Sequence, residues 1–144
     1  MMMRRGHTLL ELILVLAVTG LCLALATPIL GDFLDWVAAD GAAHDVAMAI
    51  GVARQGAVGR GVLSRLRIAP ESLAVDLRDS GGWVPWRRFP GPAARGVTLA
   101  VSNPEVVFSP LGIGWGASNT TITLTRGGRE ERITTSRVGR VKRW

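Results

Sequence analysis

An apolar run near the N-terminus limits what this chain can fold into more than any other feature. Residues 9–26 are almost wholly apolar and carry one charge, at Glu11, with Arg4 and Arg5 just before them. As a helix, this run spans ~27 Å, close to the ~30 Å hydrocarbon core of a bilayer. Basic residues before the run and none just after it predict a cytoplasmic N-terminus. We therefore expect a single-pass inner-membrane protein whose remaining chain lies in the periplasm.

Helical spacing continues beyond the apolar run. Apolar residues recur at intervals of three and four from Leu30 to Ala53, with acidic residues between them. Proline destabilises a helix interior by about 3 kcal/mol, so Pro28 marks a bend or a local unwinding. The pattern predicts one helix from about Thr8 to about Gly59, kinked near Pro28.

A cleaved secretory signal is the alternative interpretation of the first segment. The basic residues before the apolar run fit such a signal, and the small residues Ala24 and Ala26 fit its cleavage pattern. Cleavage there would leave Thr27 as the new N-terminus. The charge of Glu11 and the helical spacing beyond Ala26 favour an uncleaved helix.

The rest of the chain alternates in the manner of short strands. Leu73, Val75 and Leu77, for example, alternate with more polar residues at a period of two. Strands are predicted at residues 62–68, 73–78, 83–86, 97–101, 106–108, 120–125, 130–135 and 138–144, with a loop at 87–96 and a hairpin turn at 126–129. The predicted fold class is α+β, a long N-terminal helix packed on a small antiparallel β-sheet head.

Residues that usually carry catalysis or metal binding are scarce. The only cysteine is Cys22, which excludes an intramolecular disulfide, and there are two histidines. His44 and Asp45 are neighbours in sequence, and adjacent residues on a helix do not face each other. We therefore expect a protein that is not an enzyme and has no cofactor and no metal site.

Charge is divided along the chain. Between His7 and Ala53 there are five acidic residues and no Lys or Arg, whereas from Arg54 onward there are fifteen Lys or Arg and six acidic residues. In one interpretation, the acidic helix face and the basic head surface are simply solvated. In the other, the separation of charge serves assembly, or the basic surface contacts a polyanion.

The start of the chain resembles the prepilin motif, in which a basic leader ending in glycine precedes an apolar helix. Residues 4–11 read Arg-Arg-Gly-His-Thr-Leu-Leu-Glu. The resemblance implies cleavage after Gly6 by a prepilin peptidase and methylation of the new N-terminal amine of His7, which stands where the family usually has phenylalanine. It further implies that filament assembly uses Thr8, Leu9, Leu10, Glu11 and Pro28.

Glu11 has two interpretations. A carboxylate within a membrane span is costly, about 2.5–3.5 kcal/mol at the helix centre, and it gains from a partner. In a filament, the partner implied by the family is the N-terminal amine of a neighbouring subunit. Alternatively, the carboxylate reaches the cytoplasmic interface and has no partner.

The order of features along the whole chain resembles the minor pseudopilins of the GspH/FimT type. The resemblance is carried by Ala53-Arg54, by Phe-Ser-Pro-Leu-Gly at 108–112 and by Arg-Val-Gly-Arg-Val at 137–141. It implies a cleaved leader (1–6), a transmembrane and filament-core half of the helix (7–28), an amphipathic half (29–60) and a periplasmic β head (61–144). The implied partners are other pilins or pseudopilins in a filament tip complex, the prepilin peptidase and an inner-membrane assembly platform. The function this implies first is that of a minor subunit of a type II secretion pseudopilus.

The basic C-terminus suggests an alternative function. Residues 139–142, Gly-Arg-Val-Lys, resemble the Gly-Arg-x-Arg element by which some FimT-type minor pilins bind DNA during natural transformation. Lysine still contacts a phosphate as a point charge but lacks the bidentate geometry of arginine. Alternatively, these basic residues have a structural role, because a strand edge rich in Lys and Arg prevents edge-to-edge aggregation. The candidate DNA-binding residues are Arg137, Arg140, Lys142 and Arg143.

Overall fold

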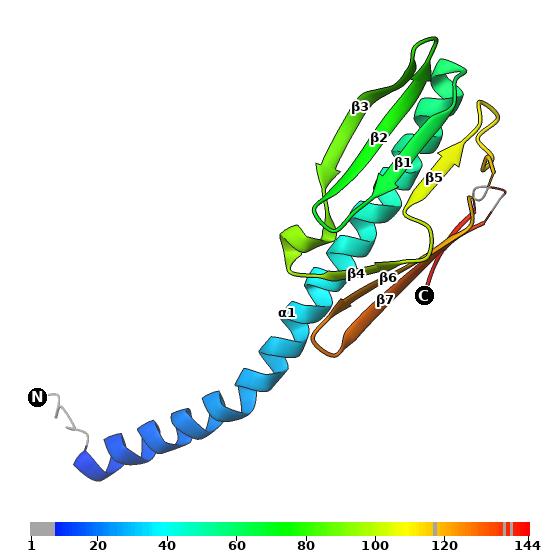
Figure 1. Cartoon of the computed structure of the whole chain (residues 1–144). Coiled ribbons are helices and arrows are strands. Elements are labelled where there is room, and N and C mark those ends of the chain that lie inside the picture. The colour runs from blue at the N-terminus through cyan, green and yellow to red at the C-terminus, as the bar shows by residue number, and fades with distance from the viewer. Residues whose placement is uncertain (1–7, 117, 137, 139) are drawn as a thin grey trace, which may run out of the picture. The chain divides into compact units, whose positions relative to one another are not determined.

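The chain is described by a computed structural model that covers residues 8–116, 118–136, 138 and 140–144. Contacts divide it into two compact units, Met1–Leu34 and Asp35–Trp144. A single helix, α1 (Leu9–Arg60), contributes to both units and continues through Pro28 (Figure 1). The predicted helix is confirmed at both ends, whereas a kink near Pro28 stays a prediction. We call residues 9–34 the apolar half of α1, residues 35–60 its head half, and Asp35–Trp144 the head unit.

The end of α1 follows from its sequence. Gly61 has a positive φ of 65°, a conformation that glycine adopts without a steric penalty. The Gly61 N–H donates to the carbonyl of Val58, and the Val62 N–H donates to that of Ala57. This pair of hydrogen bonds is the Schellman motif, which satisfies the last carbonyl groups of a helix.

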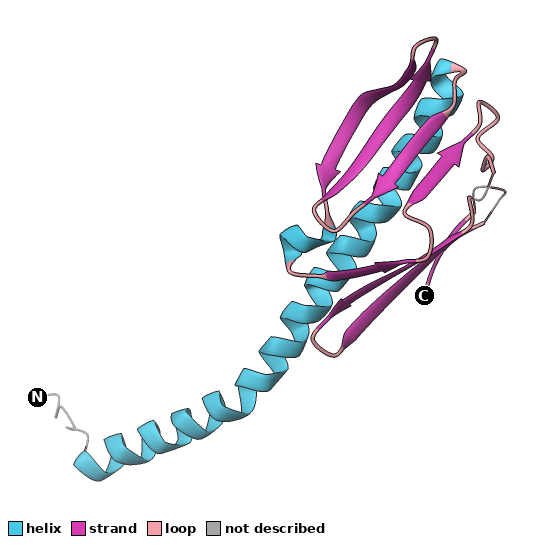
Figure 2. Ribbon diagram, viewed as in Figure 1, coloured by secondary structure: helices cyan, strands magenta, loops and turns pink. Residues whose placement is uncertain are grey.

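Eight strands in the head unit form two antiparallel four-stranded sheets (Figure 2). Sheet A has the order β3-β2-β1-β5, with β1 (Ser64–Ile68), β2 (Ser72–Asp79), β3 (Gly82–Pro90) and β5 (Glu105–Phe108). Sheet B has the order β4-β6-β7-β8, with β4 (Thr98–Val101), β6 (Thr120–Arg126), β7 (Arg129–Thr135) and β8 (Val141–Arg143). A short 3-10 helix, η1 (Pro92–Arg95), connects β3 to β4. The predicted α+β fold is confirmed.

Two strand predictions were wrong in extent. The loop predicted at 87–96 is absent, because β3 continues to Pro90 and η1 follows. Pro85 and Pro90 are compatible with β3 because it lies at the edge of sheet A, where a missing backbone donor leaves no neighbour unpaired. The last strand begins at Val141 rather than at Val138, which lies in a turn.

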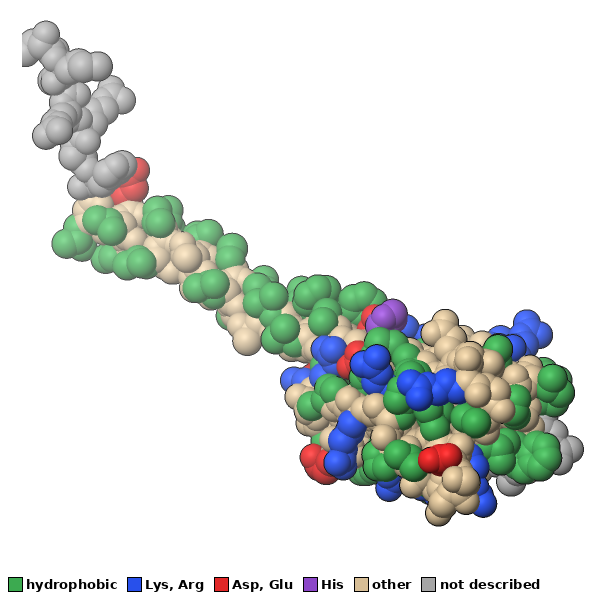
Figure 3. All heavy atoms as spheres, turned by 90° about the horizontal axis from the view of Figure 1, so that it is seen from above, with side chains coloured by type: hydrophobic (Ala, Val, Ile, Leu, Met, Phe, Trp, Pro, Cys, Tyr) green, Lys and Arg blue, Asp and Glu red, His purple; other side chains and the backbone are tan. Residues whose placement is uncertain are grey.

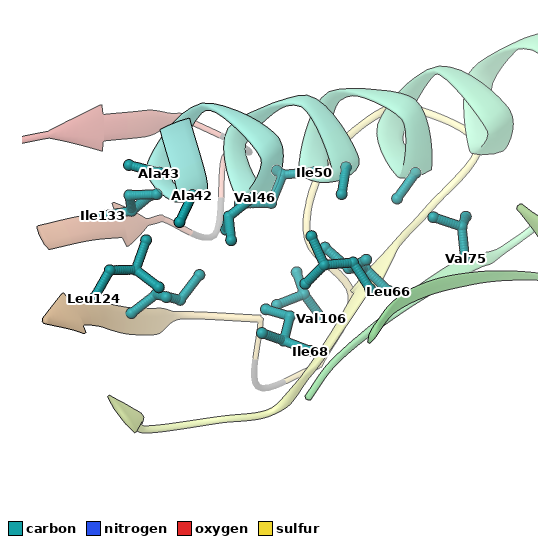
Figure 4. Close-up of a cluster of buried hydrophobic side chains, with 14 of the residues drawn as sticks. Ala42, Ala43, Val46, Ile50, Leu66, Ile68, Val75, Val106, Leu124 and Ile133 are labelled. Carbon is teal, nitrogen blue, oxygen red and sulfur yellow. The ribbon is translucent and has the colours of Figure 1, made fainter. Parts of the chain in front are cut away.

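The core lies between the head half of α1 and both sheets. Small side chains, such as Ala42 and Ala43, line the buried face of the helix and let the sheets approach closely (Figure 4). The larger buried side chains of the cluster are Val46, Ile50, Leu66, Ile68, Leu73, Val75, Val97, Val106, Phe108, Ile122, Leu124 and Ile133.

Sheet A meets the helix through Trp86. The register between β2 and β3 shifts between Val75 and Asp76, which leaves Trp86 as the extra residue of a β-bulge. Its ring packs so closely on the helix that a Cβ at Gly56 would lie 2.6 Å from the ring. Glycine at this helical position therefore makes room for the tryptophan.

Candidate functional site

The apolar half of α1 is the first candidate functional surface. Its large apolar side chains, from Leu9 to Leu30, are all exposed within the chain. Figure 3 shows hydrophobic side chains covering this half and Lys and Arg side chains spread over the head unit. Among the described residues, α1 is the one helix long and apolar enough to cross a membrane. So extensive an apolar surface is typical of a membrane or protein contact.

Two threonine hydroxyls within this half are satisfied locally. The hydroxyl of Thr19 donates to the carbonyl of Val15 (2.7 Å), and that of Thr27 donates to the carbonyl of Leu23 (2.8 Å). Such i−4 hydrogen bonds remove the penalty of bringing a hydroxyl into an apolar environment. These two hydroxyls are therefore compatible with a hydrocarbon environment.

The first turn of α1 contains several of the residues predicted to serve assembly. The backbone N–H of Glu11 donates to Oγ1 of Thr8 (3.2 Å), so Thr8 is the N-cap of the helix. The spacing Thr-x-x-Glu is that of a capping box, a signal of a helix N-terminus that is visible in the sequence. Leu9 and Leu10 are strongly exposed, and the predicted cleavage and methylation residues, Gly6 and His7, lie outside the described residues.

The acidic residues of the head half contact arginines of the β region. Asp35 pairs with Arg126 (2.9 Å) and Asp45 pairs with Arg95 (2.8 Å). Asp40 pairs with Arg143 of β8. The division of charge seen in the sequence is thus partly balanced inside the head unit, where it joins the helix to the sheets.

A second charged cluster lies on the outer face of sheet A. Asp76 is only 2% exposed, and its carboxylate accepts hydrogen bonds from Arg65 (2.8 Å) and Arg67 (3.0 Å). Burial alone would raise the pKa of Asp76, but the hydrogen bonds from Arg67 and Arg65 outweigh it and lower the pKa. The ring of Trp83 stacks on Arg65, with 4.6 Å between the ring centroid and Cζ. The cluster stabilises sheet A, and Asp76, which stands between the apolar residues Val75 and Leu77, is its sequence signal.

The four predicted DNA-binding residues differ in their surroundings. Arg143 pairs with Asp40 and with Glu131 (3.2 Å), so its charge is engaged within the chain. Although burial lowers the pKa of Arg143, hydrogen bonds to Asp40 and Glu131 raise it overall. Arg137 lies outside the described residues.

Arg140 and Lys142, in contrast, line an open cleft of about 450 Å³ at the end of sheet B. The Nζ of Lys142 lies 3.3 Å from the centroid of the Trp144 ring. The described residues that line the cleft carry hydroxyl, amide or cationic side chains, and none of them is acidic or apolar. Of the predicted residues that the structure describes, Arg140 and Lys142 are the two that line this cleft.

The described residues bring together no group of three or more His, Cys, Asp or Glu that could hold a metal ion. Cys22 is exposed on the apolar half of α1 and forms no disulfide.

The sequence was compared with known proteins. No protein-family model matches the chain. It is 34% identical to the pilin-like protein PilA1 of Thermus thermophilus, over 157 aligned positions that cover 98% of this chain and 99% of the relative. The chain belongs to the family of pilin-like proteins.

Solved structures resemble this pilin-like protein in fold. The type IV minor pilin FimU of Pseudomonas aeruginosa aligns with a TM-score of 0.64 and 18% identity, over 76% of this chain and 90% of FimU. The minor pseudopilin EpsH from the type 2 secretion system of Vibrio cholerae aligns with a TM-score of 0.60 and 15% identity, over 74% of this chain and 95% of EpsH. Both likenesses confirm the pilin fold, a long N-terminal helix packed on antiparallel sheet.

Proposed function

We propose that this pilin-like protein is a minor structural subunit of a pilus or pseudopilus filament. The observation that carries the proposal is the apolar half of α1, which leaves its large apolar side chains exposed within the chain. In the membrane this half spans the bilayer, and in the filament it packs against the same segment of neighbouring subunits. The head unit then lies in the periplasm, and an inner-membrane platform adds the subunit to the filament.

We favour a type IV pilus over a type II secretion pseudopilus. The sequence resemblance alone pointed first to the pseudopilin, and the likeness to EpsH supports that alternative. However, the full-length relative is named a pilin-like protein, and FimU is a type IV minor pilin. Deletion of the gene is expected to reduce surface pili and to leave protein export unchanged. Loss of export with normal piliation would reverse the assignment.

Processing after Gly6 is the first step of the proposed assembly. Mass spectrometry of the mature chain should find a methylated N-terminus at His7. Substitution of Gly6 by a bulky residue should leave the leader attached. A mature N-terminus at Thr27 would instead identify a cleaved secretory signal and exclude the filament proposal.

Glu11 tests assembly itself. Glu11→Gln keeps the side chain of the capping box but removes the charge, whereas Glu11→Ala removes both. We expect both variants to insert in the membrane and both to be absent from sheared filaments, because pairing with a neighbouring N-terminal amine needs the carboxylate. Normal incorporation of Glu11→Gln would limit the role of Glu11 to helix capping.

DNA capture is a second candidate function, favoured by the exposed Arg140 and Lys142 beside an acid-free cleft. The purified protein should bind DNA with an affinity whose logarithm falls linearly with the logarithm of the salt concentration. Arg140→Ala and Lys142→Ala should weaken binding. Arg143→Ala should have a smaller effect, because that guanidinium is paired with Asp40 and Glu131. Absence of binding at low salt would exclude this function.

A further inference from the structure

Two hydrogen-bonded threonines, Thr120 and Thr135, contribute to the lining of the cleft at the end of sheet B. The hydroxyl of Thr120 donates to the carbonyl of Asn103 (2.8 Å), and that of Thr135 donates to the carbonyl of Ser118 (3.1 Å). Thr120 and Thr135 are both buried and face each other across β6 and β7. Their hydroxyl protons are therefore used in hydrogen bonds within the chain.

The wall of the cleft presents a row of polar groups across three strands. Thr121 of β6 pairs with Thr134 of β7, which in turn pairs with Lys142 of β8. Directly opposed residues in antiparallel strands have Cβ atoms about 4.5–5.5 Å apart, so the three side chains stand side by side. Arg140 adds a second cation at the rim.

The hydroxyls of this row differ from those of Thr120 and Thr135. Within the described part of the chain, the side chains of Thr121 and Thr134 make no hydrogen bond, and the exposed Asn119 amide makes none either. Each hydroxyl has one proton to donate. The cleft therefore presents two hydroxyl donors, an amide and two cations, and its lining contains no carboxylate. Such groups can donate hydrogen bonds to the several acceptor oxygens of one tetrahedral oxyanion.

We propose that this cleft binds one phosphate group, with Thr121 and Thr134 as hydrogen-bond donors and Lys142 and Arg140 supplying charge. The proposal concerns a discrete site and differs from binding by a diffuse basic surface, because neutral hydroxyls contribute to it. It deepens the second candidate function, DNA capture at the same cleft, and is independent of filament assembly. A nucleic-acid backbone and a phospholipid headgroup both carry such a group, and the experiment distinguishes them.

The test uses the full-length protein in detergent micelles and inorganic phosphate as the probe. Titration should shift the backbone amide resonances of Thr121, Thr134 and Lys142 in a saturable manner. The double variant Thr121→Val/Thr134→Val, which removes only the two hydroxyls, should weaken phosphate binding about tenfold, because hydrogen bonds to a charged group are strong. Lys142→Ala should weaken it further.

A matched control lies on the same strand. Thr123 and Thr125 of β6 do not line the cleft, so Thr123→Val/Thr125→Val makes the same change of chemistry outside the site and should bind phosphate as the wild type does. Equal affinity of the wild type and the Thr121→Val/Thr134→Val variant would overturn the proposal, as would the absence of saturable shifts.

The source of the phosphate follows from two further probes. One probe is a single-stranded oligonucleotide, and the other is a short-chain phosphatidylglycerol that dissolves in the micelles. We expect one of them to shift the same resonances and to be displaced by inorganic phosphate. That probe identifies the molecule whose phosphate group the cleft binds. Shifts with neither probe would overturn a role for the site in binding either ligand. Filament incorporation of the Thr121→Val/Thr134→Val variant should be normal, so failure of the wild type to enter filaments would overturn the proposed function and leave this binding result intact.

Discussion

The two halves of α1 belong to one continuous helix but have opposite relations to the rest of the chain. In the apolar half, large apolar side chains are exposed on all sides. In the head half, a face of small residues is buried under two sheets and three aspartates pair with arginines. The difference shows that the head half has its partner within the chain, whereas the apolar half needs a bilayer or neighbouring subunits to cover it.

The largest expected effect comes from replacing an isoleucine by alanine in the head half, compared with the same replacement in the apolar half. Ile50 is 1% exposed and Ile13 is 55% exposed. Ile50→Ala should lower the free energy of unfolding of the head unit by about 2–5 kcal/mol, because it leaves a cavity in the core. Ile13→Ala should leave it within about 0.5 kcal/mol. Urea unfolding of the micelle-solubilised chain measures both, and equal effects would contradict the contrast between the halves.

A second comparison uses glycine. An added Cβ at Gly56 would lie 2.6 Å from the Trp86 ring, whereas nothing in the chain lies within 4 Å of such an atom at Gly20. Gly56→Ala should destabilise the head unit by about 1–3 kcal/mol, because the ring must move out of the core. Gly20→Ala should leave the thermal midpoint of the head unit unchanged. Trp86→Ala combined with Gly56→Ala should show strong non-additivity.

Acid should destabilise the head unit through Asp76. The pKa of Asp76 lies below its ordinary value of 3.8, so its ion pairs stabilise the folded state above about pH 4. This contribution is lost as the pH falls through the lowered pKa. Asp76→Asn should destabilise the head unit by about 1–3 kcal/mol at neutral pH and flatten its stability profile between about pH 5 and pH 2. A profile unchanged by the substitution would mean that Asp76 does not set the acid response.

The smallest expected effect concerns a partly exposed ion pair. Asp45→Asn removes the pair with Arg95 and should lower the stability of the head unit by about 0.2–1 kcal/mol. Asp32→Asn lies in the apolar half and should leave that stability unchanged. The Asp45 effect should shrink as salt is added, and an effect insensitive to salt would indicate a packing role instead.

The sequence predicts local features well and long-range ones poorly. The helix and most strands were predicted correctly because their apolar periods are local. Residues 87–90 were mistaken for a loop because Pro85 and Pro90 look like breakers until β3 is known to be an edge strand.

The candidate site shows the same limit. The exposure of Arg140 and Lys142 was predictable from their positive charge and from their spacing of two residues, which places them on one face of a strand. The ion pair between Arg143 and Asp40, however, joins residues far apart in the chain, and no local sequence pattern predicts it. Likewise, the cleft depends on Ser102, which follows β4, meeting Thr121, Thr134 and Lys142 of β6, β7 and β8.

The three aspartates of the head half also bear on how a filament subunit carries load. A spacing of five residues turns each aspartate by about 140° around the helix axis relative to the one before it. Their arginines accordingly come from η1, the end of β6 and β8. Ion pairs at three angles around the helix oppose rotation of α1 about its own axis. A torque applied to α1 is therefore transmitted to the sheets, and the helix does not turn relative to them.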